Sequence, residues 1–336
     1  MVCLMLKILA TCCAVTALAI TSGFAKKPNI VFLFSDDHAV NAISAYGGPF
    51  KDIAPTPGID RLAKEGMISH TTFCANSICG PSRACILTGK HSHLNGFLNN
   101  NASHFNGHQQ TFPLLLKGSG YTTAMIGKWH LHSNPVGFDH WEILPGQGAY
   151  YNPDFIQMDG SKKRFEGHCN DLVTDKGIAW IKKAQAEGKP FVAMIQYKAP
   201  HRNWAAAKRH LTLFDDITMP EPDSLFDDYA NRSKAVANHA MGIDKHMSWS
   251  HDMKFHGKNL FPEYFSGPGS NGAYHRMSKE DKKIWDAAYE PKNQKFIADM
   301  KAGKLKHKDI VRWKYQRYIK DYLLSLIHIS EPTRHI

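Results

Sequence analysis

Three short apolar runs constrain the fold of this chain more than any other feature. Turn-forming residues bound each run, and the runs cover residues 29–35, 121–127 and 191–197. Apolar runs of this length predict strands that are fully buried, as in a parallel sheet. The sequence between and around the runs predicts helices at residues 57–66, 82–89, 111–117 and 171–186. Strands that alternate with helices in this way indicate an α/β fold, with a mostly parallel sheet sandwiched by helices.

The second half of the chain gives weaker signals. Residues 213–228 are rich in proline and aspartate, which predicts a surface loop. Residues 229–310 are polar and weakly periodic, so we expect loops and short helices that form an insertion covering the site. A last helix is expected over residues 312–324.

Polar side chains follow all three apolar runs, at the point where each strand should end. In chain order they are Asp36 and Asp37, then Lys128 and His130, then His201. The carboxyl ends of parallel strands meet at one edge of a sheet, where α/β proteins bind their ligands. Taken singly, an aspartate pair is often a helix cap, and a histidine after proline is usually a surface residue. Their coincidence at one edge instead predicts a functional site.

The first 25 residues have the layout of a secretory signal peptide. Lys7 precedes an apolar stretch, and Gly-Phe-Ala at residues 23–25 places small residues where cleavage would follow Ala25. The weaker alternatives are a buried N-terminal helix or a lipidated Cys12 or Cys13. We therefore expect a secreted or periplasmic protein. No later stretch reaches the roughly 18 apolar residues of a membrane span, so none is expected.

Residues 79–89, CGPSRACILTG, place a cysteine at a strand-to-helix junction, with Pro81 near the start of the expected helix. Such a cysteine can be half of a disulfide, a thiol nucleophile or a target of modification. Only four cysteines lie beyond the signal peptide, too few for a disulfide scaffold. They leave room for one bridge, between Cys169 and either Cys74 or Cys85.

The chain is basic, with a formal net charge of +11, or +10 once Lys7 is removed with the signal peptide. A basic exported protein without a nucleic-acid motif suits an anionic extracellular partner such as an acidic polysaccharide. An ordinary solvated basic surface explains the charge equally well.

Four motifs in sequence order resemble those of the formylglycine-dependent sulfatases, a family of the alkaline phosphatase superfamily. They are Pro-Asn-Ile through Ser-Asp-Asp at 28–37, Cys-Gly-Pro-Ser-Arg with Leu-Thr-Gly-Lys at 79–90, Gly-Tyr-Thr-Thr through Gly-Lys-Trp-His at 120–130, and Lys-Ala-Pro-His at 198–201. The Cys-x-Pro-x-Arg core alone would arise by chance, but the ordered set is specific. The resemblance implies an alkaline phosphatase-like sulfatase fold, with residues 26–324 as a partial catalytic domain.

The resemblance further implies that a formylglycine-generating or anaerobic maturation enzyme oxidises Cys79 to formylglycine. The hydrated aldehyde carries two hydroxyls on one carbon. One attacks the sulfur of a sulfate ester, and the other, once deprotonated, expels sulfate by carbon–oxygen cleavage and restores the aldehyde. A divalent cation, expected to be Ca²⁺, would bind Asp36, Asp37 and the modified Cys79.

The remaining roles that the resemblance implies are electrostatic and acid–base. Arg83 would steady the hydrated aldehyde, and Lys128 would bind sulfate oxygen. His130 would assist the chemistry of the aldehyde hydroxyls. His201 would protonate the leaving alcohol or bind sulfate.

The chain departs from the family pattern toward its C-terminus. A downstream segment of Ser-Asp-His-Gly or Asp-Asn type, and a further lysine, are expected in such sulfatases and are not found. Residues 325–336 look like the translation of a sequencing adapter. We therefore expect a truncated gene with an artefactual tail, a partly liganded cation and an inactive polypeptide. A genuine short C-terminus is the alternative.

The expected substrate is a sulfated carbohydrate. Within the family, the segments around Tyr150 and Trp204 look most like those of N-acetylglucosamine-6-sulfatases, which favours 6-O-sulfated N-acetylglucosamine. Iduronate sulfates and algal galactan sulfates stay open. The alternative functions are a phosphatase or phosphodiesterase of the same superfamily, and a non-catalytic carbohydrate-binding protein.

Overall fold

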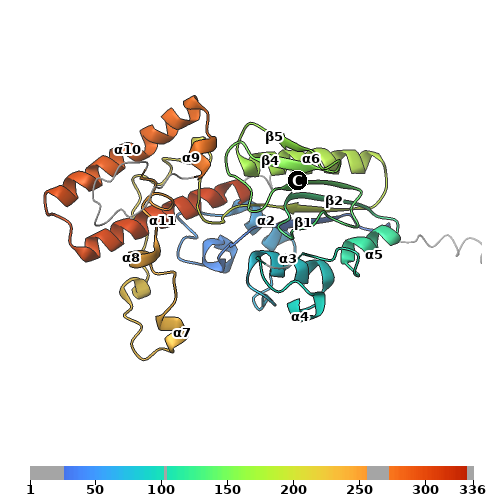
Figure 1. Cartoon of the computed structure of the whole chain (residues 1–336), viewed down its shortest axis with the longest axis horizontal. Helices are drawn as coiled ribbons and strands as arrows, with labels where there is room; N and C mark the ends of the chain where they lie inside the picture. Colours follow the sequence, from blue (N-terminus) through green and yellow to red (C-terminus); the bar gives the residue numbers. More distant parts are fainter. Residues whose placement is uncertain (1–25, 102–103, 256–271, 331–336) are drawn as a thin grey trace, which may run out of the picture.

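A computed structural model describes residues 26–101, 104–255 and 272–330 (Figure 1). The expected signal peptide, residues 1–25, lies outside the described residues, as does the end of the expected artefactual tail. An α/β part holds the sheet, and a largely helical part built on α10 and α11 lies beside it (Figure 1).

The described residues form a sheet of six strands in the spatial order β1-β6-β2-β3-β4-β5. Parallel pairing joins β1, β6, β2 and β3, whereas β4 and β5 each pair antiparallel with the strand before them in this order. This confirms the prediction of a mostly parallel sheet. The strand bounds are β1 Ile30–Phe34, β2 Thr122–Lys128, β3 His140–Leu144, β4 Asp154–Gln157, β5 Lys162–Arg164 and β6 Phe191–Gln196.

Helices cover both faces of the sheet, α6 on one side and α3 with α5 on the other (Figure 1). Among the described residues, the α-helices of the sheet part are α2 Pro57–Glu65, α3 Cys79–Thr88, α4 Ser92–Asn95, α5 Phe112–Gly118 and α6 Cys169–Ala186. Those that follow are α7 Lys234–Ala237, α8 Ile243–His246, α9 Gly272–Arg276, α10 Lys279–Lys301 and α11 His307–Ser330.

The central strands are buried on both faces because successive side chains point to opposite sides of a sheet. Met125 of β2 and Met194 of β6 pack in one cluster with Leu87 of α3. Ile195, one residue further along β6, packs in the opposite cluster with Val173 of α6. Both layers therefore hold the carboxyl ends of β2 and β6 in fixed positions beside the start of α3.

The first strand differs from its prediction. Residues 30–34 are only half-buried, because β1 pairs with β6 on one side and lies at the edge of the described sheet. The prediction of full burial, which suits a central strand, is wrong for β1 within the described residues.

The prediction for residues 229–310 is also wrong in part. Short helices occur there, but α10 is 23 residues long. Ser278 caps its first turn by accepting a hydrogen bond from the Asp281 amide, and Pro291 lies inside it. That internal proline and the many lysines masked the helical pattern in the sequence. Trp285 and Phe296 are among the buried side chains that hold α10 in place.

The last helix extends further than expected. α11 runs from His307 to Ser330, and Leu326 is buried in the main hydrophobic cluster. The artefactual origin of residues 325–336 stays a prediction.

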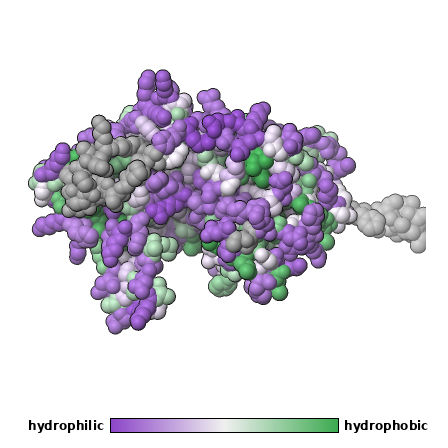
Figure 2. Space-filling view, viewed as in Figure 1, coloured by the Kyte–Doolittle hydropathy of each residue, from purple (hydrophilic) through white to green (hydrophobic). Residues whose placement is uncertain are grey.

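Among the described helices, none combines the length and apolar character that crossing a membrane requires. The face of the molecule seen in Figure 2 is mostly hydrophilic, with small hydrophobic patches scattered over it.

Candidate active site

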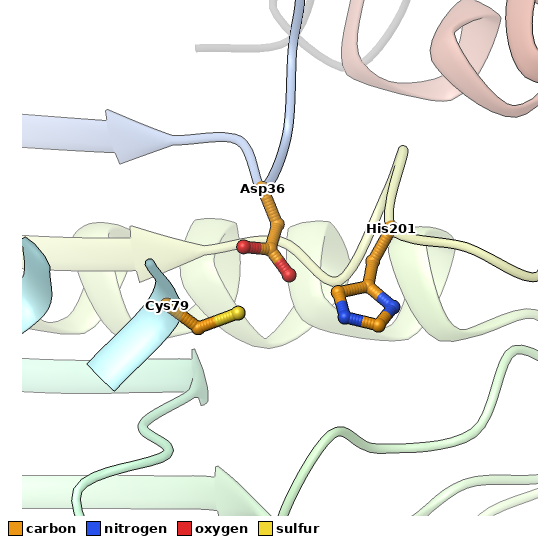
Figure 3. A group of neighbouring side chains, drawn as sticks. All are labelled: Asp36, Cys79 and His201. Atoms are coloured by element: carbon orange, nitrogen blue, oxygen red, sulfur yellow. The ribbon is translucent and has the colours of Figure 1, made fainter. Parts of the chain in front are cut away.

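The strand order brings the predicted site residues to one edge of the sheet. Asp36 follows β1, Lys128 ends β2 and His201 follows β6, and these three parallel strands are neighbours. Cys79 is the first residue of α3, which approaches the same edge. Figure 3 shows the side chains of Asp36, Cys79 and His201 converging, and one ligand atom from each lies within 4.8 Å of the other two.

A buried ion cluster surrounds the Asp36 carboxylate. Lys128 Nζ contacts Asp36 Oδ2, and Arg83 Nη2 lies 3.5 Å from Asp36 Oδ1. The three side chains are 5% or less exposed. Burial alone would raise the pKa of Asp36, but the charges of Lys128 and Arg83 hold it below its usual value. The Asp36 carboxylate therefore pairs with two positively charged side chains, and one positive charge beside Cys79 is not balanced by this carboxylate.

Contacts from the sheet fix the Arg83 guanidinium. Arg83 Nη1 donates to the Lys128 carbonyl at 2.7 Å and to the side-chain oxygen of Gln196. The guanidinium also lies 5.0 Å from the centre of the Phe34 ring. Burial lowers the pKa of Arg83 against the opposing charge of Asp36, but arginine stays protonated in proteins. Sequence reasoning missed Gln196, and the one signal was a polar residue at the end of an apolar strand.

The start of α3 comes unusually close to the chain around it. A Cβ at Gly80 would lie 2.5 Å from a Phe97 ring carbon and 2.9 Å from the His130 carbonyl oxygen. The Gly80 amide donates to the Asn100 side chain at 3.0 Å. The missing side chain at position 80 lets Cys79 approach the strand ends, and the positive end of the helix dipole lies at the same point.

The two predicted histidines both lie at this edge. Burial, and then the charge of Lys128, lowers the pKa of His130 to about 4 and that of His201 to about 4. Both imidazoles are therefore neutral at neutral pH. A sulfate ester whose oxygens lie beside His201 adds negative charge, which raises the pKa of that histidine and favours its protonated form.

Asp37 is placed differently from its neighbour. Its carboxylate is not part of the described group of converging ligand atoms, whereas the predicted set was Asp36, Asp37 and Cys79. Burial and the charge of Asp36 raise the pKa of Asp37. Its backbone lies in the left-handed region at φ 57°, and its carbonyl accepts a hydrogen bond from Tyr322 at 3.0 Å.

These residues fit the groups that the motif implies. Two adjacent carboxylates, the buried Asp36 and the more exposed Asp37 with its raised pKa, suit a hard divalent cation with oxygen ligands. A ring nitrogen of His201 lies within 4.8 Å of the ligand atoms of Asp36 and Cys79, so this side chain also borders the cation site. Among the described residues, the buried atoms Nε of Arg83 and Nδ1 of His130 have no hydrogen-bond partner, which suits added oxygen atoms at position 79.

Comparison with protein families then decides the class. The family model described as "Sulfatase" matches residues 28–249, about two thirds of the chain. This chain belongs to the sulfatase family.

Individual sulfatases extend the match. An N-acetylglucosamine-6-O-sulfatase of Bacteroides thetaiotaomicron is 46% identical over 312 residues, covering 91% of this chain and 53% of the relative. The human N-acetylgalactosamine-6-sulfatase is 37% identical over 230 residues, covering 56% of this chain and 42% of the relative. This sulfatase chain thus spans about half the length of the curated relatives it matches.

A solved sulfatase structure matches almost the whole chain. The structure of BT4656 in complex with its substrate D-glucosamine-2-N,6-O-disulfate aligns with a TM-score of 0.83 and 45% sequence identity. The alignment covers 92% of this chain and 61% of that one. The alkaline phosphatase-like sulfatase fold expected from the motifs is confirmed.

The expected disulfide is absent from this sulfatase chain. Of the cysteines that the structure describes, Cys74, Cys79, Cys85 and Cys169 are all free. Cys169 is buried at the start of α6, where burial raises its pKa to about 12 and leaves an inert thiol. The prediction of a bridge from Cys169 to Cys74 or Cys85 is wrong.

Proposed function

We propose that this protein is a sulfuric ester hydrolase that removes sulfate from a sulfated carbohydrate, with 6-O-sulfated N-acetylglucosamine as the best candidate. One observation carries the proposal. Cys79, at the start of α3, lies beside the buried cluster of Asp36, Arg83 and Lys128. A thiol needs no such arrangement to pack, whereas an anionic ester needs it to react.

Positive groups prepare the site for a sulfate ester. Lys128 and Arg83 share the Asp36 carboxylate, so the two buried cations can also attract an incoming sulfate oxygen. The positive end of the α3 dipole lies at Cys79 and also favours an anion there. Lys128 binds sulfate oxygen in this proposal, and Arg83 steadies residue 79.

Residue 79 is proposed to be a formylglycine. The hydrated aldehyde would supply one hydroxyl that attacks sulfur and a second whose deprotonation releases the sulfate. The unpartnered Nδ1 of His130 is a proton acceptor for such a hydroxyl, since the low pKa of His130 keeps its ring neutral. A formylglycine-generating or anaerobic maturation enzyme is the partner that this proposal requires.

The cation is proposed to be Ca²⁺, held by Asp36, Asp37 and residue 79, with His201 close by. When bound it would neutralise the two carboxylates and draw negative charge from the sulfate oxygens.

His201 is proposed as the proton donor to the leaving sugar oxygen. It lies on the loop after β6, across from Cys79 (Figure 3). An alkoxide is a poor leaving group, so a proton delivered from His201 as the ester bond breaks lowers the barrier.

The proposed substrate is supported by two comparisons. The N-acetylglucosamine-6-O-sulfatase is 46% identical to this chain, and BT4656 was solved with a 6-O-sulfated glucosamine. The proposed location, secreted or periplasmic, rests on the signal-like residues 1–25 and suits an extracellular polysaccharide.

A panel of sulfated sugars tests the proposal. The protein is expressed from its complete reading frame with a maturation enzyme and offered the 6-sulfates of N-acetylglucosamine and N-acetylgalactosamine, an iduronate 2-sulfate and a phosphate monoester. We expect sulfate release that is fastest from the N-acetylglucosamine ester and absent in Cys79→Ala. Release of phosphate alone, or equal rates with Cys79→Ala, would contradict it.

A further inference from the structure

The loop that carries His201 is tied to the rest of the site at several points. The Tyr197 amide donates to the Phe34 carbonyl at 2.8 Å, and the Asp36 amide donates to the Ala199 carbonyl at 3.0 Å. These main-chain bonds bind the loop to the end of β1. At the histidine itself, the Tyr150 hydroxyl donates to the His201 carbonyl at 2.7 Å. This bond joins a tyrosine side chain directly to the residue proposed as proton donor.

Tyr150 is rigidly held. It is 2% exposed, and its carbonyl accepts a 2.7 Å hydrogen bond from the Cys169 amide at the start of α6. The Lys198 ammonium lies 4.7 Å from the centre of its ring, and the His168 ring stacks against it at 5.8 Å. Because Tyr150 is packed so closely, it fixes the loop that carries His201 relative to the start of α6.

The cation on the ring is itself fixed. Lys198 is 5% exposed, and its Nζ donates to the Gln147 carbonyl at 3.2 Å. Burial raises the pKa of Tyr150, so its hydroxyl stays protonated and remains a donor at any working pH.

We propose that Tyr150 is a positioning residue that sets the place of His201 for proton donation to the leaving sugar oxygen. This inference rests on the proposed sulfatase function. Tyr150 acts through His201 and touches no reacting atom. A small displacement of a proton donor can lower a rate about 100-fold, because proton transfer depends steeply on geometry.

Leaving-group dependence distinguishes this role from a structural one. A sugar alcohol leaves poorly and depends on a proton from His201, whereas 4-nitrophenolate leaves without one. Loss of the Tyr150 hydroxyl should therefore slow hydrolysis of the sugar sulfate far more than hydrolysis of 4-nitrophenyl sulfate. A variant that merely loosens the fold slows both reactions alike.

The next residue supplies a matched control. Tyr151 is 4% exposed, and its hydroxyl donates to the Ala206 carbonyl at 2.7 Å, further along the same loop. Tyr151→Phe removes the same group from the same kind of bond but leaves the anchor of His201 in place.

The experiment compares kcat of wild type, Tyr150→Phe and Tyr151→Phe on both esters, per mole of formylglycine. We expect Tyr150→Phe to lose about 10- to 100-fold on the sugar sulfate and no more than about 3-fold on 4-nitrophenyl sulfate. Tyr151→Phe should keep the wild-type ratio of the two rates. An unchanged ratio in Tyr150→Phe overturns the inference.

A labelling measurement decides the same question without catalysis. Diethylpyrocarbonate acylates accessible histidines, and peptide mass spectrometry follows His201 against the other histidines as internal references. We expect His201 to react several-fold faster in Tyr150→Phe and at the wild-type rate in Tyr151→Phe; equal rates in all three proteins overturn the inference. If wild type hydrolyses neither ester, the proposed function fails while the labelling still tests the position of His201.

Discussion

Two buried ion clusters in this molecule have similar members and different surroundings. The site cluster consists of Asp36, Arg83 and Lys128 at the edge of the sheet. The helical cluster consists of Lys254, Arg317 and Asp321. Each combines a lysine, an arginine and an aspartate that are nearly inaccessible to solvent.

The helical cluster pairs its charges with neighbouring groups of the helical part, although Asp321 Oδ2 accepts no hydrogen bond within the described residues. Lys254 Nζ donates to the His251 carbonyl at 3.0 Å and lies 3.6 Å from Asp321. Tyr289 donates to Asp321 at 2.7 Å, and Arg317 donates to the Met253 carbonyl at 3.1 Å. These bonds fasten residues 251–254 to α10 and α11.

The site cluster faces a reactive position instead. Its carboxylate converges with Cys79 and His201, and its guanidinium keeps an unpartnered Nε among the described residues. Buried cationic side chains that donate to main-chain carbonyls hold a loop in place. Buried cationic side chains that lie beside a nucleophile instead form part of a binding site. The difference predicts that equivalent substitutions damage activity in one cluster and stability in the other.

The largest effect is expected from the nucleophile position. Cys79→Ala should lower kcat by a factor on the order of 10⁶, because loss of a nucleophile removes covalent catalysis altogether. Steady-state sulfate release measures it. Cys85→Ala, a free and partly buried cysteine of the same helix, is the control and should keep wild-type activity. Residual activity of Cys79→Ala within about tenfold of wild type would remove residue 79 from the mechanism.

Asp36→Asn should have the next largest effect. The substitution leaves Lys128 and Arg83 without their shared counter-charge and removes a cation ligand, so kcat should fall by a factor of about 10³. Activity is compared at matched folded fraction, judged by circular dichroism. A variant that unfolds but turns over normally when folded would make the site cluster structural like the helical one.

Asp321→Asn should act on stability. Breaking a buried ion pair on one side costs about 3–5 kcal/mol, since Lys254 and Arg317 stay buried without the charge of Asp321. Urea unfolding measures the free energy, and kcat of the folded fraction should be unchanged. A stable variant with impaired turnover would show that the two clusters do not divide their roles as described.

The partly buried ion pair between Lys176 and Glu142 gives the smallest effect and a pH dependence. Burial would raise the pKa of Glu142, but hydrogen bonds from His140 and Lys176 lower it to about 2. Its contribution to stability is therefore complete above the unfolded value near 4.3 and lost as the pH falls toward 2. Lys176→Met should cost about 1 kcal/mol at pH 7. The difference from wild type in urea unfolding should shrink between pH 4 and pH 2; a constant difference would contradict it.

The site cluster and the helical cluster also differ in how far the sequence could predict them. β2 and β6 were predictable because buried parallel strands leave continuous apolar runs. β1 left a similar run although it is only half-buried, and the site residues follow these three strands in the sequence. β4 and β5 were not, because they are short and partly or fully exposed. The motifs gave Asp36, Cys79, Arg83 and Lys128 because a sulfatase-like site places them next to recognisable strand ends and helix starts.

Other residues left a weaker signal in the sequence or none. Lys254 and Asp321 lie on a loop and on a helix far apart in the chain, and only packing brings them together. Gln196 and Tyr150 support site residues through contacts that cross from one element to another. Local sequence pattern reports burial and helix ends, whereas cross-element hydrogen bonds depend on the tertiary arrangement.

The central claim is that residue 79 is modified, and mass spectrometry tests it most directly. The protein is expressed from its complete reading frame with a maturation enzyme that is active on a control sulfatase, and the proteolytic peptide holding residue 79 is weighed. The account predicts the mass of an aldehyde or its hydrate at position 79, with Cys74 and Cys85 still thiols. An unmodified thiol at position 79 under these conditions would contradict the account.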